Sequence, residues 1–187
     1  RLQEGPSPVL LEMLLAGELD ALVGRLPGAS RSARFPAVVR HRKLYEEPMC
    51  IACGANHRLA KAHGVTPDDL AACNWVLPSR DSLSRRALED AFLLCGRTVP
   101  TPLLEVTSFV YGLAMVARSD VLTVAPRTAV RSQERLGLVR TLKTSLQLKP
   151  TSIYWMRRRS SDGDAVLDGL ERWLLRNHRN AGVKPRG

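Results

Sequence analysis

Short apolar runs alternate with helical stripes of apolar residues along most of the chain. The first stripe begins at Pro8, with Ser7 placed to cap the helix, and ends at Gly17, a residue that suits a left-handed helix end. The apolar run 21–23 follows closely and has no polar alternation, which predicts a strand covered on both faces. Such alternation favours an α/β fold, in which helices cover sheets.

The same patterns predict the later elements. Strands are expected at 37–41, 44–52, 75–77, 103–106, 121–124, 138–139 and 153–156. Helices are expected at 66–72, 83–95, 109–117 and 127–133, with a short helical piece inside 55–62. A final helix begins at Asp162, with an apolar stripe at Val166, Leu167, Leu170, Trp173 and Leu174.

Composition narrows the class of protein. With 187 residues the chain can bury a sizeable core, and its hydrophobic share of 44% and charged share of 25% are ordinary for a globular protein. The net charge of +10 is high, but the basic residues are spread, with concentrations at 31–43, 157–159 and 176–186. Aromatic residues do not interleave with them as base stacking requires, which favours a solvated surface. A basic nucleic-acid-binding module remains an alternative, and it predicts strong salt-dependent binding to DNA.

The four cysteines include one C-x-x-C pair, Cys50 and Cys53, inside an apolar run. Residues three apart on a strand point to opposite faces, and no second pair follows, so we expect structural, reduced cysteines and no metal. Reduced cysteines, no signal peptide at the start and no apolar run long enough to span a bilayer predict a cytoplasmic protein without a membrane partner.

No catalytic arrangement is visible in the sequence. None of the four histidines, 41, 57, 63 and 178, has a partner at metal or triad spacing. A nucleophile elbow, a glycine-rich phosphate loop and a paired-carboxylate site are also absent from the sequence. We therefore expect no enzyme and no cofactor.

Several segments in a specific order resemble one known family. They are LLAGELDALVGR at 14–25, LYEEPMCIACGANHRLA at 44–60, VTPDDL with NWVLP at 65–78, AFLLCG at 91–96 and EVTSFVYGLAMVARSDVLTVAPR at 105–127. In order and spacing these resemble the effector-binding domain of LysR-type bacterial transcriptional regulators. The resemblance implies a two-lobed fold similar to the type II periplasmic binding proteins, each lobe a mixed sheet flanked by helices.

The resemblance also implies a domain organisation. Lobe one would hold 1–53 and the closing strand and helix at 151–178, lobe two would hold 54–150, and 179–187 would be a disordered tail. In the family a DNA-binding winged helix-turn-helix, a linker helix and the first strand and helix of lobe one precede the segment that begins here at Arg1. We therefore expect lobe one to lack that strand and helix. Arg118, Ser119 and Asp120 stand where many members have Gly-x-Gly, a change that still permits a tight turn.

Ligand-facing positions of the family fall on six residues of this chain: Arg25, Ser79, Ser82, Thr107, Ser108 and Pro126. Helix starts present unpaired N–H groups and the positive end of the helix dipole, so the turns at 79–82 and 107–108 can hold a carboxylate or a sugar hydroxyl. Alternatively, Ser82 and Ser108 are only helix caps, and Arg25 forms a salt bridge between the lobes. Phe109 and Tyr111 are expected in the core.

The resemblance implies a ligand-sensing and oligomerisation domain of a transcriptional regulator. It would bind a small-molecule inducer (a carboxylate, an aromatic acid or a sugar) in the cleft between the lobes, form a homodimer or homotetramer, and contact DNA only through the missing N-terminal domain. The helix at 83–95 is the counterpart of one of the family's dimer helices. A stand-alone solute-binding protein of the same fold is the alternative.

Overall fold

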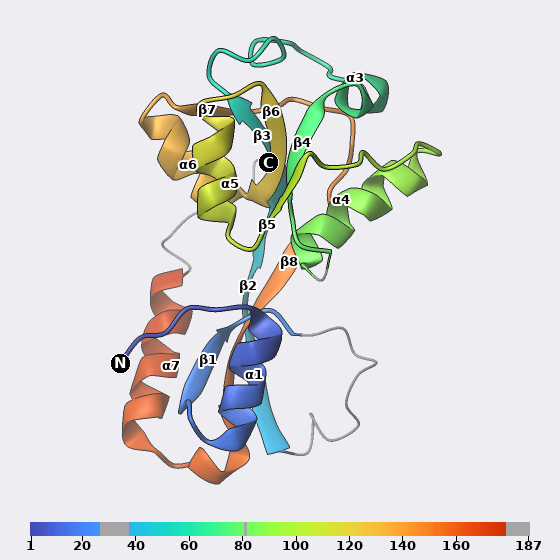
Figure 1. The fold of residues 1–187 in the computed structure, drawn as a ribbon. Coiled ribbons are helices and arrows are strands. Elements are labelled where there is room, and N and C mark those ends of the chain that lie inside the picture. The colour runs from blue at the N-terminus through green and yellow to red at the C-terminus, as the bar shows by residue number, and fades with distance from the viewer. Residues whose placement is uncertain (27–37, 81, 179–187) are drawn as a thin grey trace. The chain divides into compact units, whose positions relative to one another are not determined.

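The computed structural model describes residues 1–26, 38–80 and 82–178. The chain forms two compact units (Figure 1). Unit 1 comprises residues 1–46 and 152–187, and unit 2 comprises residues 47–151. Each unit contains its own sheet with helices, as the predicted α/β class requires.

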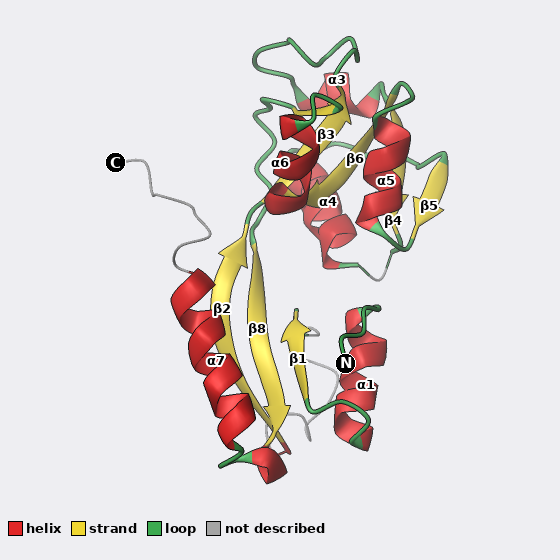
Figure 2. Cartoon of the chain, turned by 90° about the vertical axis from the view of Figure 1, so that its left-hand side faces the viewer, coloured by secondary structure: helices red, strands yellow, loops and turns green. Residues whose placement is uncertain are grey.

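Unit 1 is built on a sheet with strand order β1-β8-β2. Its elements are α1 (Ser7–Ala16), β1 (Ala21–Gly24), β2 (Val39–Glu47), β8 (Thr151–Arg158), the 3-10 helix η1 (Arg159–Ser161) and α7 (Ala165–His178). Figure 2 shows the three strands between α1 and α7. Leu14 of α1 packs with Leu22 and Met156 of the sheet, whereas the buried Arg157 pairs with Asp168 of α7 at 2.7 Å. Since successive strand residues point to opposite faces, the two helices cover opposite faces of the sheet.

Three details of unit 1 differ from the sequence predictions. Helix α1 begins at Ser7 with Pro6 in the cap position and no side-chain cap, so the predicted Ser7 cap is wrong. Strand β1 is covered less than expected, because Val23 is 45% exposed. On α7 three residues of the predicted apolar stripe, Val166, Leu170 and Trp173, are exposed, while Leu167 of the stripe is buried. Glu171, outside the stripe, is also buried, and its carboxylate accepts a bond from Arg42 at 3.3 Å.

Unit 2 is built on a sheet with strand order β5-β4-β6-β3-β7. Its strands are β3 (Met49–Gly54), β4 (Asn74–Pro78), β5 (Leu104–Val106), β6 (Val121–Pro126) and β7 (Val139–Thr141). Its helices are α3 (Pro67–Ala71), α4 (Leu83–Leu94), α5 (Phe109–Val116) and α6 (Arg127–Arg135). β4 runs parallel to β5 and β6, while β3 runs antiparallel to β6 and β7.

The two faces of this sheet carry separate apolar clusters. One cluster joins Trp75, Leu77 and Phe92 under α3 and α4, and the other joins Val76 and Leu113 under α5 and α6. The alternation of β3 places Cys53 in the first cluster and Cys50 in the second, as strand geometry predicts. All four cysteines are free thiols.

The observed division between the units differs from the expected lobe boundary. The boundary falls at 46/47 and 151/152, whereas the resemblance implied 53/54 and 150/151. The difference is β3, which pairs with β6 and β7 and therefore belongs to unit 2. Residues 55–62 form turns without the expected helical piece. The expected tail at 179–187 lies outside the described residues.

We expect Gly54→Ala to destabilise unit 2 by about 1–3 kcal/mol, because an added Cβ would lie 2.7 Å from the Val116 carbonyl oxygen, which is backbone and cannot move aside cheaply. Urea unfolding measures the change. The matched control is Gly112→Ala, where the new Cβ meets ordinary contacts at 3.5 Å and the helix gains up to about 1 kcal/mol. Equal stability of the two variants would contradict the packing argument.

Candidate functional site

Three neighbouring parallel strands of unit 2 end at one edge of the sheet. Pro78 of β4 lies opposite Val106 of β5, and the Ser79 N–H donates to the Val106 carbonyl at 3.1 Å. The register of β4 with β6, in which Trp75 faces Leu122, carries the end of β6 to the same edge. Because parallel strands deliver their carboxyl ends together, Ser79, Thr107 and Pro126 all lie there. We call this the carboxyl edge of unit 2.

A helix follows each of these strands along the chain. Ser82 caps α4 by accepting from the Arg85 N–H at 3.1 Å, and Ser108 caps α5 by accepting from the Val110 N–H at 3.3 Å. Both residues are therefore caps, as one of the sequence alternatives stated. A cap hydroxyl still carries its own hydrogen, so both serines retain a donor for a bound molecule.

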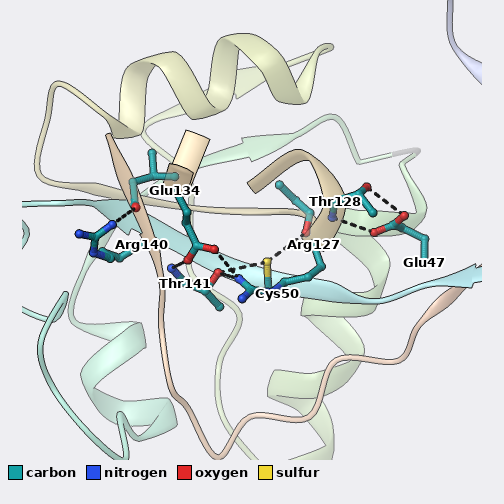
Figure 3. A network of polar contacts seen from close by, with 9 residues as sticks. Glu47, Cys50, Arg127, Thr128, Glu134, Arg140 and Thr141 are labelled. Atoms are coloured by element: carbon teal, nitrogen blue, oxygen red, sulfur yellow. Dashed lines mark hydrogen bonds and ion pairs between the residues drawn. The ribbon is translucent and has the colours of Figure 1, made fainter. Parts of the chain in front are cut away.

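The start of α6 is capped in a different way. Pro126 takes the cap position and offers no side-chain hydrogen bond. Instead, Glu47 accepts from the Thr128 N–H at 3.1 Å and from the Thr128 hydroxyl at 3.0 Å, although Glu47 is only 4% exposed. Figure 3 shows this carboxylate turned toward Thr128. Sequence reasoning missed Glu47, because its role depends on the antiparallel pairing that sets Met49 opposite Pro126.

Behind this contact, a polar network joins α6 to β7 (Figure 3). Arg127 pairs with Glu134 at 3.1 Å and also donates to the Thr141 hydroxyl, while the Thr141 N–H donates to Glu134 at 2.7 Å. Burial tends to raise the pKa of Glu134, but the bonds from Thr141 and the charge of Arg127 outweigh it and hold the pKa below its usual value. Burial raises the pKa of the Cys50 thiol, whose Sγ lies 3.7 Å from the Ala125 carbonyl oxygen.

Two arginines also form ion pairs here, one within α4 and one in the turn before it. Arg85 is buried and pairs with Glu89 at 2.6 Å and with Glu105 at 3.7 Å. Arg80 reaches the same Glu105 at 3.6 Å from a side chain that is 80% exposed. The Arg80 side chain therefore lies mostly in solvent although it reaches this carboxylate.

The structure brings five of the six predicted residues to the carboxyl edge of unit 2: Ser79, Ser82, Thr107, Ser108 and Pro126. Arg25 follows β1 and belongs to unit 1, so its part in a shared site stays a prediction. The expectation that Phe109 and Tyr111 are core residues is wrong, since they are 44% and 71% exposed at the start of α5.

Two shallow hollows of unit 2 lie at the opposite edge of the sheet. One, of about 320 Å³, is lined by Gly54, Asn56, His57 and 117–120. The His57 Nε2 lies 2.9 Å from the Asp120 carboxylate, and the His57 Nδ1 accepts from the Leu59 N–H at 3.0 Å. Burial lowers the pKa of His57, and the charge of Asp120 opposes this change only in part. Through its contact with Asp120, His57 therefore holds the loop between α5 and β6 against the turn at 54–59.

Neither a metal site nor a membrane span is found in the described part of the chain. No group of three or more histidine, cysteine, aspartate or glutamate residues within 1–26, 38–80 and 82–178 is placed to hold a metal ion. Within the same ranges, every helix is too short or too polar to cross a bilayer.

Comparison with protein families gives a match over nearly the whole chain. A family model described as the LysR substrate binding domain matches residues 1–179. The HTH-type transcriptional regulator GbpR of Azospirillum brasilense is 29% identical over 156 residues, which cover 82% of this chain and 44% of that protein. The HTH-type transcriptional regulator GalR of Pseudomonas putida is 25% identical over 155 residues, which cover 83% and 38%. The chain thus spans less than half the length of these two regulators.

Solved structures agree with the predicted fold. The effector binding domain of QuiR, in complex with shikimate, has a TM-score of 0.75 at 14% identity, covering 96% of this chain and 81% of that one. The regulatory domain of Synechocystis PCC6803 CcmR, in complex with 2-PG, has a TM-score of 0.75 at 13% identity, covering 92% and 79%. The reduced OxyR regulatory domain from Pseudomonas aeruginosa has a TM-score of 0.71 at 22% identity, covering 98% and 82%. The expected periplasmic-binding-protein-like fold is confirmed.

We expect the stability of unit 2 to fall as the pH drops below about 6.5, the usual pKa of histidine. The folded pKa of His57 is lowered, so the unfolded chain binds a proton more readily between the two pKa values, and stability is lost across that window. Urea midpoints at pH 7.5 and pH 5.5 measure the loss. His57→Asn should flatten this dependence, while His63→Asn, at an exposed position, should not. The same slope in both variants would contradict the assignment.

Proposed function

We propose that this chain, which belongs to the family of LysR substrate-binding domains, is the ligand-sensing part of a transcriptional regulator. The observation that carries the proposal is the carboxyl edge of unit 2, where three strand ends and three helix starts meet. Backbone N–H groups and the hydroxyls of Ser79, Ser82, Thr107 and Ser108 gather there. Such an edge suits a small polar molecule.

The polar groups of this edge differ in what they offer a ligand. The Ser82 and Ser108 hydroxyls have each accepted one bond from their own helix and can donate to a ligand oxygen. Thr107 is exposed beside Ser108. The side chains of Phe109 and Tyr111 follow in the first turn of α5 and are exposed, so they offer apolar surface at this end of the helix. A ligand with several oxygens and an apolar face fits this combination.

Similar domains with bound small molecules support this role. The QuiR and CcmR domains hold shikimate and 2-PG, respectively, on the same fold. For this chain we propose an inducer from the carboxylates, aromatic acids or sugars. Homo-oligomerisation, DNA contact through another part of the regulator and a cytoplasmic location belong to the same proposal, since the relatives are named as HTH-type transcriptional regulators.

The alternatives receive less support. The relatives named above are transcriptional regulators, which favours a sensor over a stand-alone solute-binding protein. A nucleic-acid-binding module needs a basic surface with stacking aromatics, whereas Arg80, Arg85 and Arg127 are each paired with a carboxylate.

We expect a thermal-shift screen of neutral sugars, aliphatic acids and aromatic acids to find a molecule that raises the melting temperature of this chain, because a ligand of the folded state stabilises it by mass action. At a hundred times its Kd the ligand should add about 2.7 kcal/mol. Ser108→Ala should then weaken binding roughly 3- to 10-fold through the lost hydrogen bond.

The control is Ser132→Ala on the exposed side of α6, which should leave binding unchanged. Because Ser108→Ala also removes a helix cap, its affinity is compared with that of the wild type at a temperature where both are folded. Equal affinity of Ser108→Ala and wild type would remove Ser108 from the site, and no response to any compound would count against the sensing role.

A further inference from the structure

We infer that Arg80 and Arg85 are specificity-determining residues of this edge: their guanidinium groups converge on one point, held loosely by the chain's own Glu105, where a ligand carboxylate binds in place of Glu105. The inference rests on the proposed function and names the ligand chemistry within it. Among the ligand classes left open, it selects carboxylates.

The two guanidinium groups approach the same oxygen atom of Glu105. Arg80 lies in the turn before α4, and Arg85 lies in the first turn of that helix. The Arg80 Nε is 3.6 Å and the Arg85 Nη1 is 3.7 Å from the Glu105 Oε1. Hydrogen bonds between such groups measure about 2.7–3.2 Å. At these distances Glu105 balances the charge of both arginines but accepts a hydrogen bond from neither.

Arg85 is a buried cation whose donors are only partly satisfied. Its side chain is 4% exposed, and its Nε donates to Glu89 at 2.6 Å, which fixes the direction of the guanidinium group. Within the described part of the chain, the Arg85 Nη1 has no hydrogen-bond partner. A buried donor without a partner destabilises the folded protein, and a charged donor does so more strongly. A carboxylate that comes closer than Glu105 would therefore be stabilised at this point.

Glu105 is tied to its own strand, whereas a ligand is not. Glu105 lies on β5, where its backbone pairs with Leu77 of β4. A free carboxylate can instead move until its two oxygens accept from a guanidinium group in the parallel geometry that this pair of groups favours. The positive end of the α4 dipole adds to the attraction. These differences favour a ligand carboxylate over the carboxylate of the chain.

Solvent reaches this position, so a small molecule can enter it. The side chains of Glu105 and Arg80 are 42% and 80% exposed, and a displaced Glu105 carboxylate would turn into water rather than into the core. The hydroxyls of the carboxyl edge lie close by along the chain, since Ser79 and Ser82 stand on either side of Arg80, and Thr107 follows Glu105 by two residues. We expect one ligand to place its carboxylate on the arginines and its other oxygens on these hydroxyls.

The experiment compares matched pairs of an acid and a neutral partner: benzoate with benzamide, hexanoate with hexanamide, and glucuronate with glucose. Calorimetry at constant ionic strength gives the Kd of each compound. For the pair that binds, we expect the wild type to prefer the acid by at least about tenfold, because its carboxylate gains charge-assisted hydrogen bonds. Arg80→Gln should reduce this preference severalfold. Glu105→Gln removes the competing charge, so it should strengthen binding of the acid severalfold and leave binding of the neutral partner unchanged.

Two control variants on α4 make the same changes of charge at exposed positions. Arg86→Gln removes one positive charge, and Asp90→Asn removes one negative charge. Both should keep the wild-type preference. Arg85→Gln should abolish the preference, and circular dichroism shows whether this buried substitution leaves the chain folded. Arg80→Gln and Glu105→Gln decide the inference in either case, because their side chains reach solvent.

The outcomes separate this inference from the proposed function. Neutral compounds that bind the wild type as tightly as their acids overturn the role of the two arginines while leaving a ligand-binding domain. An unchanged preference in Arg80→Gln, or an equal change in Arg86→Gln or Asp90→Asn, also overturns it. Weaker binding of acids by Glu105→Gln does so too, because Glu105 would then support the arginines rather than compete with the ligand. If no compound binds to any of the proteins, the proposed function is contradicted and the inference falls with it.

Discussion

The parallel alignment of β4, β5 and β6 is the constraint on which the rest of unit 2 depends. Parallel strands end at one edge, and the helix that follows each strand must begin there. Three sets of unpaired helix N–H groups therefore accumulate within one small region, and each needs an acceptor. The sequence meets that need with Ser82, Ser108 and Glu47. The residues that cap the helices therefore also determine which polar groups the edge presents.

The way each helix start is satisfied decides what remains for a ligand. A serine cap accepts one bond and still carries a donor, so capping by Ser82 and Ser108 leaves the edge able to recognise oxygen atoms. A carboxylate cap only accepts, and its charge remains after the bonds are made. At the third helix start Glu47 only accepts, from the Thr128 N–H and hydroxyl, so this cap leaves no donor of its own, whereas the two serine caps do.

Local patterns predict most elements of this fold because their causes are local. Gly17 and Gly96 end helices with φ values of 86° and 66°, and Thr66 forms a capping box with Asp69 at the start of α3. The five residues of unit 2 that the resemblance gave as ligand-facing lie at the carboxyl edge because each follows a strand, and their contact with a ligand stays a prediction. Errors arose where the outcome depends on a partner elsewhere in the chain. Helix α7 buries Glu171 rather than Trp173, and Glu171 accepts a bond from Arg42 of β2, a partner that the local pattern of α7 does not reveal.

Net charge is a second property whose effect depends on where the residues lie in the structure. A formal charge of +10 suggests an anionic partner when it is taken as a property of the whole chain. At the carboxyl edge of unit 2, however, Arg80, Arg85 and Arg127 are bound to Glu105, Glu89 and Glu134, and a further carboxylate, that of Glu47, is buried beside them. The three arginines named here are therefore each paired with a carboxylate, so the net charge of the whole chain does not describe this edge. An excess of basic residues carried elsewhere on the chain can aid solubility without determining which ligand is held.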